Sequence, residues 1–389
     1  MTITPANLEH EMGTGAVLAA IWLTVAGAAG FLVMPVLLGA AVIDLGLDEK
    51  QVGYMGAAVL AGSAISAVFA AAVVRNVSWR WIAVTGLGLQ VTGLLISTLI
   101  DGFNLVMVPI TIASLGGGIT YSLALTVLSD HRAAPRLFGF SVASQVSFQV
   151  LGMLSLPLFM MPGGFDDCLI LLGLIAFLGL PVVPLLPGGS RSQTEYAHLS
   201  AAQILAQPRG LMALFGCLFF FLNIGALWAY IERIGSLAGF DPATLGQVMA
   251  AGIAMGIVGS LTAAWQSHRM GLALPLGLST AGTVLGLFLL TEPDSVALFL
   301  AGFGLFNFVW NYSLTYQYAT VAETDNSGRF LAATPAFHGL GGAAGPAIAA
   351  TYVSPGDLSA VTVIAGIAVV LSLGALLPAA LGHRPLAPG

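Results

Sequence analysis

The sequence predicts an all-α polytopic membrane protein with twelve transmembrane helices, arranged as two parallel six-helix repeats. The first observation behind this prediction is composition: the chain is 58% hydrophobic and only 7% charged. A soluble globular protein carries roughly 25% charged residues. This chain has too few charged residues to cover a surface that is exposed to water on all sides. Its 49 glycines are typical of transmembrane helices that pack closely, because small residues let two backbones approach.

The second observation is a series of apolar runs, each near the length of about 20 residues that crosses a bilayer core. The twelve predicted helices lie at residues 13–43, 52–74, 81–100, 102–128, 137–161, 168–187, 211–231, 245–266, 270–290, 295–321, 330–353 and 358–382.

The third observation is an internal repeat, which indicates a fold built from two copies of one unit. Residues 129–152 and 323–345 each contain a short charged loop, an arginine and an apolar helix rich in small residues. The offset that sets Arg136 on Arg329 is 193 positions, about half of the 389-residue chain. It also pairs Gly46 with Gly239, Asp48 with Asp241, Gly53 with Gly246, Gly93 with Gly286, and Pro162 with Pro355.

Charge predicts the orientation of the helices. Nine arginines fall in segments that would be cytoplasmic if the chain starts inside, and only Lys50 and Arg233 fall in the outer loops. This bias places both termini in the cytoplasm, with the protein in the cytoplasmic (inner) membrane. We expect six-helix bundles over residues 1–187 and 210–389, joined by a cytoplasmic linker at 188–209.

Turn signals agree with these boundaries. Gly46 and Gly239 stand where a helix is expected to end, in the position that favours glycine. Asp48 and Asp241 follow as expected N-caps of the next helices, and Pro242 stands at the first helical position.

Two parallel six-helix repeats around a central loop resemble the major facilitator superfamily. The loop after the second helix keeps Arg75 and Arg80 of the family signature, although Val74 occupies its aspartate position and Val77 its second glycine position. Residues 341–346, GGAAGP, are similar to a glycine–proline motif of family antiporters, which lies on another helix there. The resemblance implies that helices 1, 4, 7 and 10 surround a central cavity, helices 2, 5, 8 and 11 form the seam between halves, and the remaining helices face lipid.

Helix 295–321 holds the richest set of candidate substrate-binding residues. Asn307 and Asn311 lie on one polar stripe, and Tyr312 and Tyr316 on an adjacent aromatic stripe. Unpaired amides in hydrocarbon cost several kcal/mol each, so the amides must face protein or water. The stripe either lines the cavity or makes hydrogen bonds between helices.

Other candidates for substrate binding come from four more helices. Gln145 and Gln149 share one face of helix 137–161, Asn223 lies near mid-depth in helix 211–231, and Trp22 is a candidate stacking wall. His338 is the one histidine placed well inside a predicted span. It would bind an anionic group or a proton, or it is a neutral residue at a helix seam.

Charged candidates lie at the helix ends. Glu232, Arg233 and Asp44 stand at predicted outer ends, where they would form a rim or gate. Arg136 and Arg329 stand at predicted inner ends, where they either close the cytoplasmic side or only fix the topology.

These features predict a secondary transporter that moves a small neutral or weakly anionic organic solute by alternating access. Proton coupling would use His338 or Glu232. Two alternatives share the fold: a polyspecific efflux pump that exchanges protons, and a passive facilitator. We expect no enzyme, cofactor, metal or nucleic acid, since the sequence has no nucleophile–base pair, metal-ligand spacing or basic patch. The expected partners are the solute, protons and the lipid bilayer, with a monomer as the functional unit.

Overall fold

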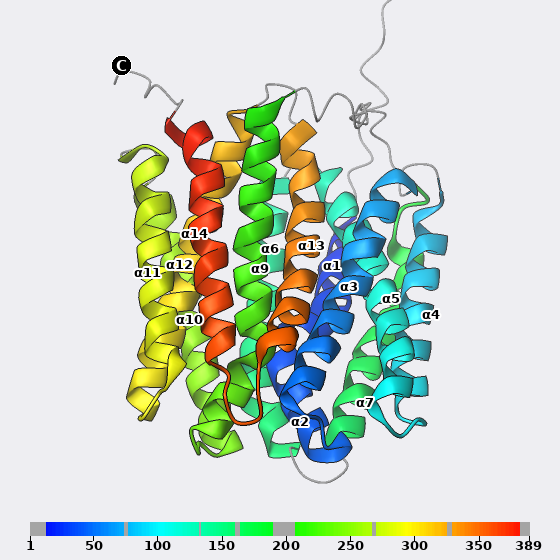
Figure 1. Ribbon diagram of the computed structural model, residues 1–389. Coiled ribbons are helices and arrows are strands. Elements are labelled where there is room, and N and C mark those ends of the chain that lie inside the picture. Colours follow the sequence, from blue (N-terminus) through cyan, green and yellow to red (C-terminus); the bar gives the residue numbers. More distant parts are fainter. Residues whose placement is uncertain are drawn as a thin grey trace, which may run out of the picture.

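A computed structural model describes residues 13–73, 77–131, 134–159, 164–189, 207–266, 270–324 and 329–381. These residues are almost entirely helical, and the helices run side by side along one axis (Figure 1). The α-helices are α1 (Thr14–Leu32), α2 (Met34–Leu45), α3 (Glu49–Val73), α4 (Trp79–Ser97), α5 (Phe103–Ser129), α6 (Ala134–Ser155), α7 (Gly164–Phe177), α9 (Pro208–Leu237), α10 (Pro242–Gln266), α11 (Ala273–Thr291), α12 (Val296–Ala322), α13 (Arg329–Tyr352) and α14 (Ser359–Leu381).

Twelve spans result from these helices, as predicted. The first span consists of α1 and α2, which are separated by a break at Val33, two residues before Pro35. The sixth consists of α7 and the 3-10 turn Leu180–Leu185 that follows it. Among the described residues, ten helical segments meet both the length and the apolarity needed to cross a membrane. The helices α3 and α13, with 25 and 24 residues, complete the set by length.

The predicted repeat is confirmed in the helix boundaries. A shift of 193 residues turns the bounds of α3 into those of α10, and the bounds of α5 into those of α12. The other four pairs of spans agree to within a few residues. In Figure 1, α4 and α5 lie at one side of the bundle and α11 and α12 at the other. Most of the predicted linker, residues 188–209, lies outside the described residues, and α9 already begins at Pro208.

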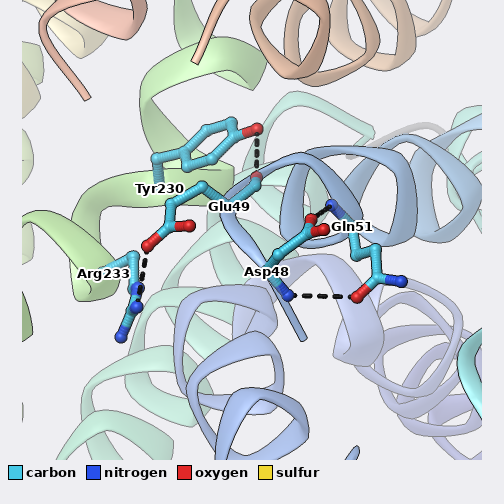
Figure 2. A network of polar contacts seen from close by, with 5 residues as sticks. All are labelled: Asp48, Glu49, Gln51, Tyr230 and Arg233. Atoms are coloured by element: carbon cyan, nitrogen blue, oxygen red, sulfur yellow. Dashed lines mark hydrogen bonds and ion pairs between the residues drawn. The ribbon is translucent and has the colours of Figure 1, made fainter. Parts of the chain in front are cut away.

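The predicted caps are also confirmed. Gly46 and Gly239 have φ angles of 62° and 85°, a left-handed backbone that favours glycine. The Asp48 carboxylate accepts a 2.8 Å hydrogen bond from the backbone N–H of Gln51, and Gln51 Oε1 accepts a 3.0 Å bond from Asp48 N (Figure 2). Asp241 caps α10 through its carboxylate, which accepts hydrogen bonds from the Thr244 N–H and hydroxyl, and these bonds lower the pKa of Asp241.

The bundle has two ends, here called the terminal end and the latch end. The terminal end is the end at which α1 begins and α14 ends. The latch end is the opposite one, which holds the turns after α2 and α9. With an even number of spans, both described termini lie at the terminal end.

Candidate functional site

A cavity of about 390 Å³ lies inside the bundle, between the two halves and within the first half. A volume of this order is typical of small-molecule sites. Among the described residues, none that lines it is Asp, Glu, Lys or Arg. Its lining comes from α1 (Gly27, Ala28, Gly30, Phe31), α2 (Leu37), α3 (Val59, Leu60, Ser63, Ala64), α4 (Gln90, Leu94), α5 (Ile110, Ala113, Ser114, Gly117, Gly118, Tyr121, Ser122, Leu125), α6 (Gln145), α7 (Leu172), α9 (Phe221, Ile224, Gly225), α12 (Tyr318) and α13 (Pro335, His338, Gly339, Gly342).

Two elements differ from what the resemblance implies. The third and sixth spans were expected to face lipid, yet α4 and α7 contribute Gln90, Leu94 and Leu172 to the cavity. Glycines on the inner helices allow this, because α1 and α5 have no side chains at Gly27 and Gly117 and their backbones nearly touch. The corresponding spans of the second half, α11 and α14, contribute no lining residue.

Polar groups of the cavity gather toward the terminal end. The Gln145 amide donates a 3.1 Å hydrogen bond to Ser141 Oγ, which in turn donates a 2.9 Å bond to Thr24 Oγ1 on α1. The Tyr121 side chain also bonds to Gln145. This chain of contacts fixes the Gln145 amide at the cavity wall and joins α1, α5 and α6.

His338 and Tyr318 face this group from the second half. The His338 ring stacks on Phe221, with centroids 3.9 Å apart and planes 16° apart, and its centroid lies 5.6 Å from that of Tyr318. The side chain is buried, and its Nε2 atom has no hydrogen-bond partner. Stacking holds the imidazole in place without using this nitrogen, which leaves it free to accept a proton or bond to a solute after a small movement.

Two other polar lining residues, Gln90 and Ser114, take part in helix packing. Gln90 donates a 2.8 Å hydrogen bond to the carbonyl of Ala26. Ser114 Oγ donates a 2.5 Å bond to the carbonyl of Val59 and accepts a 2.9 Å bond from the Ser63 N–H. These bonds hold α4 on α1 and α5 on α3, so they shape the wall of the cavity.

Contacts between the halves close the latch end. Arg233 forms a 2.9 Å ion pair with Glu49, and the Tyr230 hydroxyl donates a 2.8 Å bond to the backbone carbonyl of Glu49 (Figure 2). Trp228 Nε1 donates a 2.8 Å bond to the carbonyl of Phe31. Toward the terminal end the cavity reaches more exposed side chains, and Tyr318 is 39% exposed.

Four predicted site residues of α12 lie away from the cavity. Asn307 donates to the Phe303 carbonyl at 2.9 Å, and Asn311 donates to the Asn307 carbonyl at 3.1 Å. Asn311 also packs against Gly256 of α10. The hydroxyls of Tyr312 and Tyr316 both bond to Gln266 at the end of α10. The structure therefore places these four side chains on the side of α12 that faces α10.

Of the other predicted substrate-binding residues, Gln145 and His338 line the cavity. Gln149 is buried on α6, and Trp22 is 37% exposed on α1, both off the cavity. Asn223 is fully buried beside the lining residue Ile224, and neither atom of its amide group has a partner.

The charged candidates separate into different roles. Arg233 belongs to the latch, and Glu232 is buried beside it on α9. Asp44 accepts a 2.7 Å bond from the N–H of Phe165, so it joins α2 to α7 within the first half. Arg136 is exposed, with its guanidinium 5.6 Å from the centre of the Phe140 ring. Arg329 begins α13, and its side chain lies outside the described residues.

Sequence reasoning missed Tyr121 and Phe221 and gave Gln90 no role in a site. The run Gly116–Gly118 just before Tyr121 could have pointed to this face of α5, because small residues let neighbouring helices approach closely. No group of three or more His, Cys, Asp or Glu side chains among the described residues is placed to hold a metal ion.

Comparisons with known proteins agree with this architecture. The nucleoside transporter NupG superposes with a TM-score of 0.71 at 16% identity, over 95% of this chain and 100% of that one. The D-xylose–proton symporter gives 0.73 at 14% identity, over 93% and 95%. A bacterial homologue of the human drug peptide transporters gives 0.70 at 14% identity, over 94% and 97%. These likenesses show the fold.

No curated protein sequence gives a significant match to this chain. The family model described as Major Facilitator Superfamily matches residues 18–346, which include eleven of the twelve spans at least in part. With this match, the internal repeat and the shared fold, the chain belongs to the Major Facilitator Superfamily.

Proposed function

We propose that this protein is a secondary active transporter that carries a small uncharged organic solute by alternating access. The observation that carries the proposal is a cavity of about 390 Å³ at the boundary of the two halves, whose lining contains no charged residue in the described part of the chain. An ionic solute would lose its hydration there without gaining a counter-charge, which is costly in an apolar environment. An uncharged solute would find amide, hydroxyl and imidazole groups instead.

The latch supports an alternating mechanism. Its ion pair and hydrogen bonds join α1, α3 and α9 at one end of the cavity, and these bonds would break when the halves rock apart. The bias of arginines in the sequence favours a cytoplasmic position for the terminal end. In this proposal, the structure is closed to the outside and its cavity serves the cytoplasmic side.

His338 is the residue that we propose for proton coupling. Its Nε2 atom lacks a partner, and its ring lies beside Tyr318 and Phe221 in the lining of the cavity. A proton taken up there would alter the site at which the solute binds. Glu232 lies outside the lining residues and next to the latch, so it is the second choice.

The test uses purified protein in liposomes loaded with a fluorescent pH reporter. Uncharged metabolites, organic acids and drug-like cations are added outside in turn. Acidification of the lumen with an uncharged compound is the expected result and identifies symport. Alkalinisation would favour the efflux pump that exchanges protons. Entry of a compound without any pH change would favour the passive facilitator, and response to charged compounds alone would contradict the proposed solute class.

A further inference from the structure

Toward the latch end the cavity is apolar, and side chains of the first half form walls there. These walls come from five elements and carry no polar side chain; they are Leu37 on α2, Val59 and Leu60 on α3, Leu94 on α4, Ile110 on α5 and Leu172 on α7. Toward the terminal end, hydrogen-bonding groups come from Tyr121, Gln145, Tyr318 and His338. Between the two ends, beside Gly117, Gln90 Oε1 has no partner. The cavity is therefore apolar at one end and polar at the other.

The two ends are far enough apart to hold different parts of one molecule. Ile110 and Tyr121 both line the cavity from α5 and are separated by eleven residues along this helix. At about 1.5 Å per residue the separation is roughly 16 Å. An elongated solute can place a hydrogen-bonding head beside Tyr121 and an apolar tail beside Ile110.

The repeat shows that larger side chains occupy the matching positions of the second half. The 193-residue shift that superposes the bounds of α5 on α12 pairs Ala113 with Phe306 and Gly117 with Trp310. It also pairs Ile110 with Phe303, which stacks on Trp228 with ring centroids 6.1 Å apart. Aromatic rings therefore fill the place in the second half that small side chains leave open in the first.

We infer that the solute is an uncharged amphiphile, whose apolar tail enters this pocket of the first half, the tail pocket, while its head binds at Tyr121, Gln145, Tyr318 and His338. This inference rests on the proposed transport function and names its substrate class. Transfer of the tail from water into the apolar pocket would lower the free energy of binding. The uncharged head would exchange its hydrogen bonds with water for hydrogen bonds with the protein.

Gly30 offers a way to fill the tail pocket. It lines the cavity from α1, and a Cβ atom added there would meet only Val59 Cγ1, at an ordinary contact distance of 3.9 Å. Gly30→Leu should therefore occupy the pocket without a backbone clash, and Gly30→Ala should occupy part of it. Gly88→Leu is the matched control, because an added Cβ at Gly88 meets nothing within 4 Å and Gly88 does not line the cavity.

The experiment measures binding of N-alkylacetamides, from methyl to hexyl, to full-length protein in lipid nanodiscs. Affinity is taken from the concentration dependence of thermal unfolding. Each added methylene should tighten binding to the unsubstituted protein about three- to fourfold until the pocket is full. Gly30→Leu should bind the methyl compound normally and lose the dependence on chain length. Gly30→Ala should reach its limit at a shorter chain, and Gly88→Leu should behave as the unsubstituted protein.

The tail pocket is contradicted if affinity does not rise with chain length, if no compound binds, or if Gly30→Leu keeps the full dependence. The binding measurement needs no transport. A protein that binds these amides but moves neither solute nor protons would keep the tail pocket and refute the transport proposal. A protein that moves other solutes but shows no dependence on chain length would do the reverse.

Discussion

Trp228 Nε1 donates a 2.8 Å hydrogen bond to the backbone carbonyl oxygen of Phe31, across the boundary between the two halves. In an unbroken helix this oxygen would accept the N–H of residue 35, but that residue is proline and has none. The first span breaks here, between Leu32 and Met34. At the break this carbonyl accepts a backbone N–H from the turn and, in addition, the indole N–H of the other half. The second bond ties the shape of the first span to closure of the latch.

Substitution Trp228→Phe should favour opening of the latch, because it removes this donor and keeps an aromatic ring. A hydrogen bond contributes about 1 kcal/mol net, so the population with an open latch should rise about fivefold. Spin labels at Lys50→Cys and Ser236→Cys, both at exposed positions of the latch end, would report it as a longer distance. The two native cysteines, Cys168 and Cys217, are buried and would be replaced by alanine.

The control for this prediction is Trp310→Phe. Its indole N–H has no hydrogen-bond partner, so the same chemical change removes no bond. Equal distance distributions in the Trp228→Phe and Trp310→Phe variants would show that the bond to Phe31 does not stabilise the latch.

The ion pair between Glu49 and Arg233 should stabilise the closed latch more than a solvent-exposed ion pair would. The two side chains are only 9% and 21% exposed, so loss of one leaves the other poorly solvated. Glu49→Gln should destabilise the closed latch by about 1–2 kcal/mol. A cysteine at Ala229, which is buried beside Gly56, should then react roughly tenfold faster with a water-soluble maleimide.

A double variant in which the two charges swap positions tests whether loss of the ion pair, and no other effect of Glu49→Gln, opens the latch. Glu49→Arg combined with Arg233→Glu should restore slow labelling of the cysteine at position 229. Lys50→Gln, at the exposed neighbouring position, should leave labelling unchanged. Failure of the exchanged pair to slow the reaction would assign closure to the Tyr230 and Trp228 bonds instead.

The fold was predictable because bilayer thickness and the repeat both constrain it. Span length and the 193-residue offset predicted helix ends to within a few residues, and Gly46 and Asp241 marked turns through backbone chemistry that acts locally. The break at Val33 was not predicted. Hydropathy alone does not reveal a kink within an apolar run. Pro35 is the residue that could have suggested one.

The site was harder to predict because a polar stripe in a membrane helix has two possible neighbours. Asn311 faces Gly256 of α10, and Gln145 faces the cavity, yet both appear in the sequence as amides in apolar surroundings. The tail pocket is formed by missing side chains, at positions such as Gly30 and Ala113. Small residues are common in membrane helices, so the pocket becomes visible only beside Phe306 and Trp310 of the other repeat.

Substitution His338→Gln should separate solute movement from proton movement. Glutamine keeps a hydrogen-bonding group at the cavity wall but cannot take up a proton near neutral pH. In the liposome assay, solute entry down its gradient should continue while the accompanying pH change disappears. Gln149→Leu, which removes another buried polar group off the cavity, should retain both. Unaltered pH changes in His338→Gln would move the coupling role to Glu232.

Two neighbouring glycines of α13 should respond very differently to the same substitution. A Cβ atom at Gly341 would lie 2.0 Å from the Leu218 carbonyl oxygen of α9, whereas one at Gly342 would meet nothing within 4 Å. Backbone cannot yield as a side chain does, so Gly341→Ala should destabilise the protein by about 1–3 kcal/mol. Gly342→Ala should keep or slightly raise stability, since alanine favours helix. Thermal unfolding of both variants in nanodiscs gives the comparison. Equal midpoints would mean that α9 and α13 can separate without loss, and that their close approach does not hold the second half together.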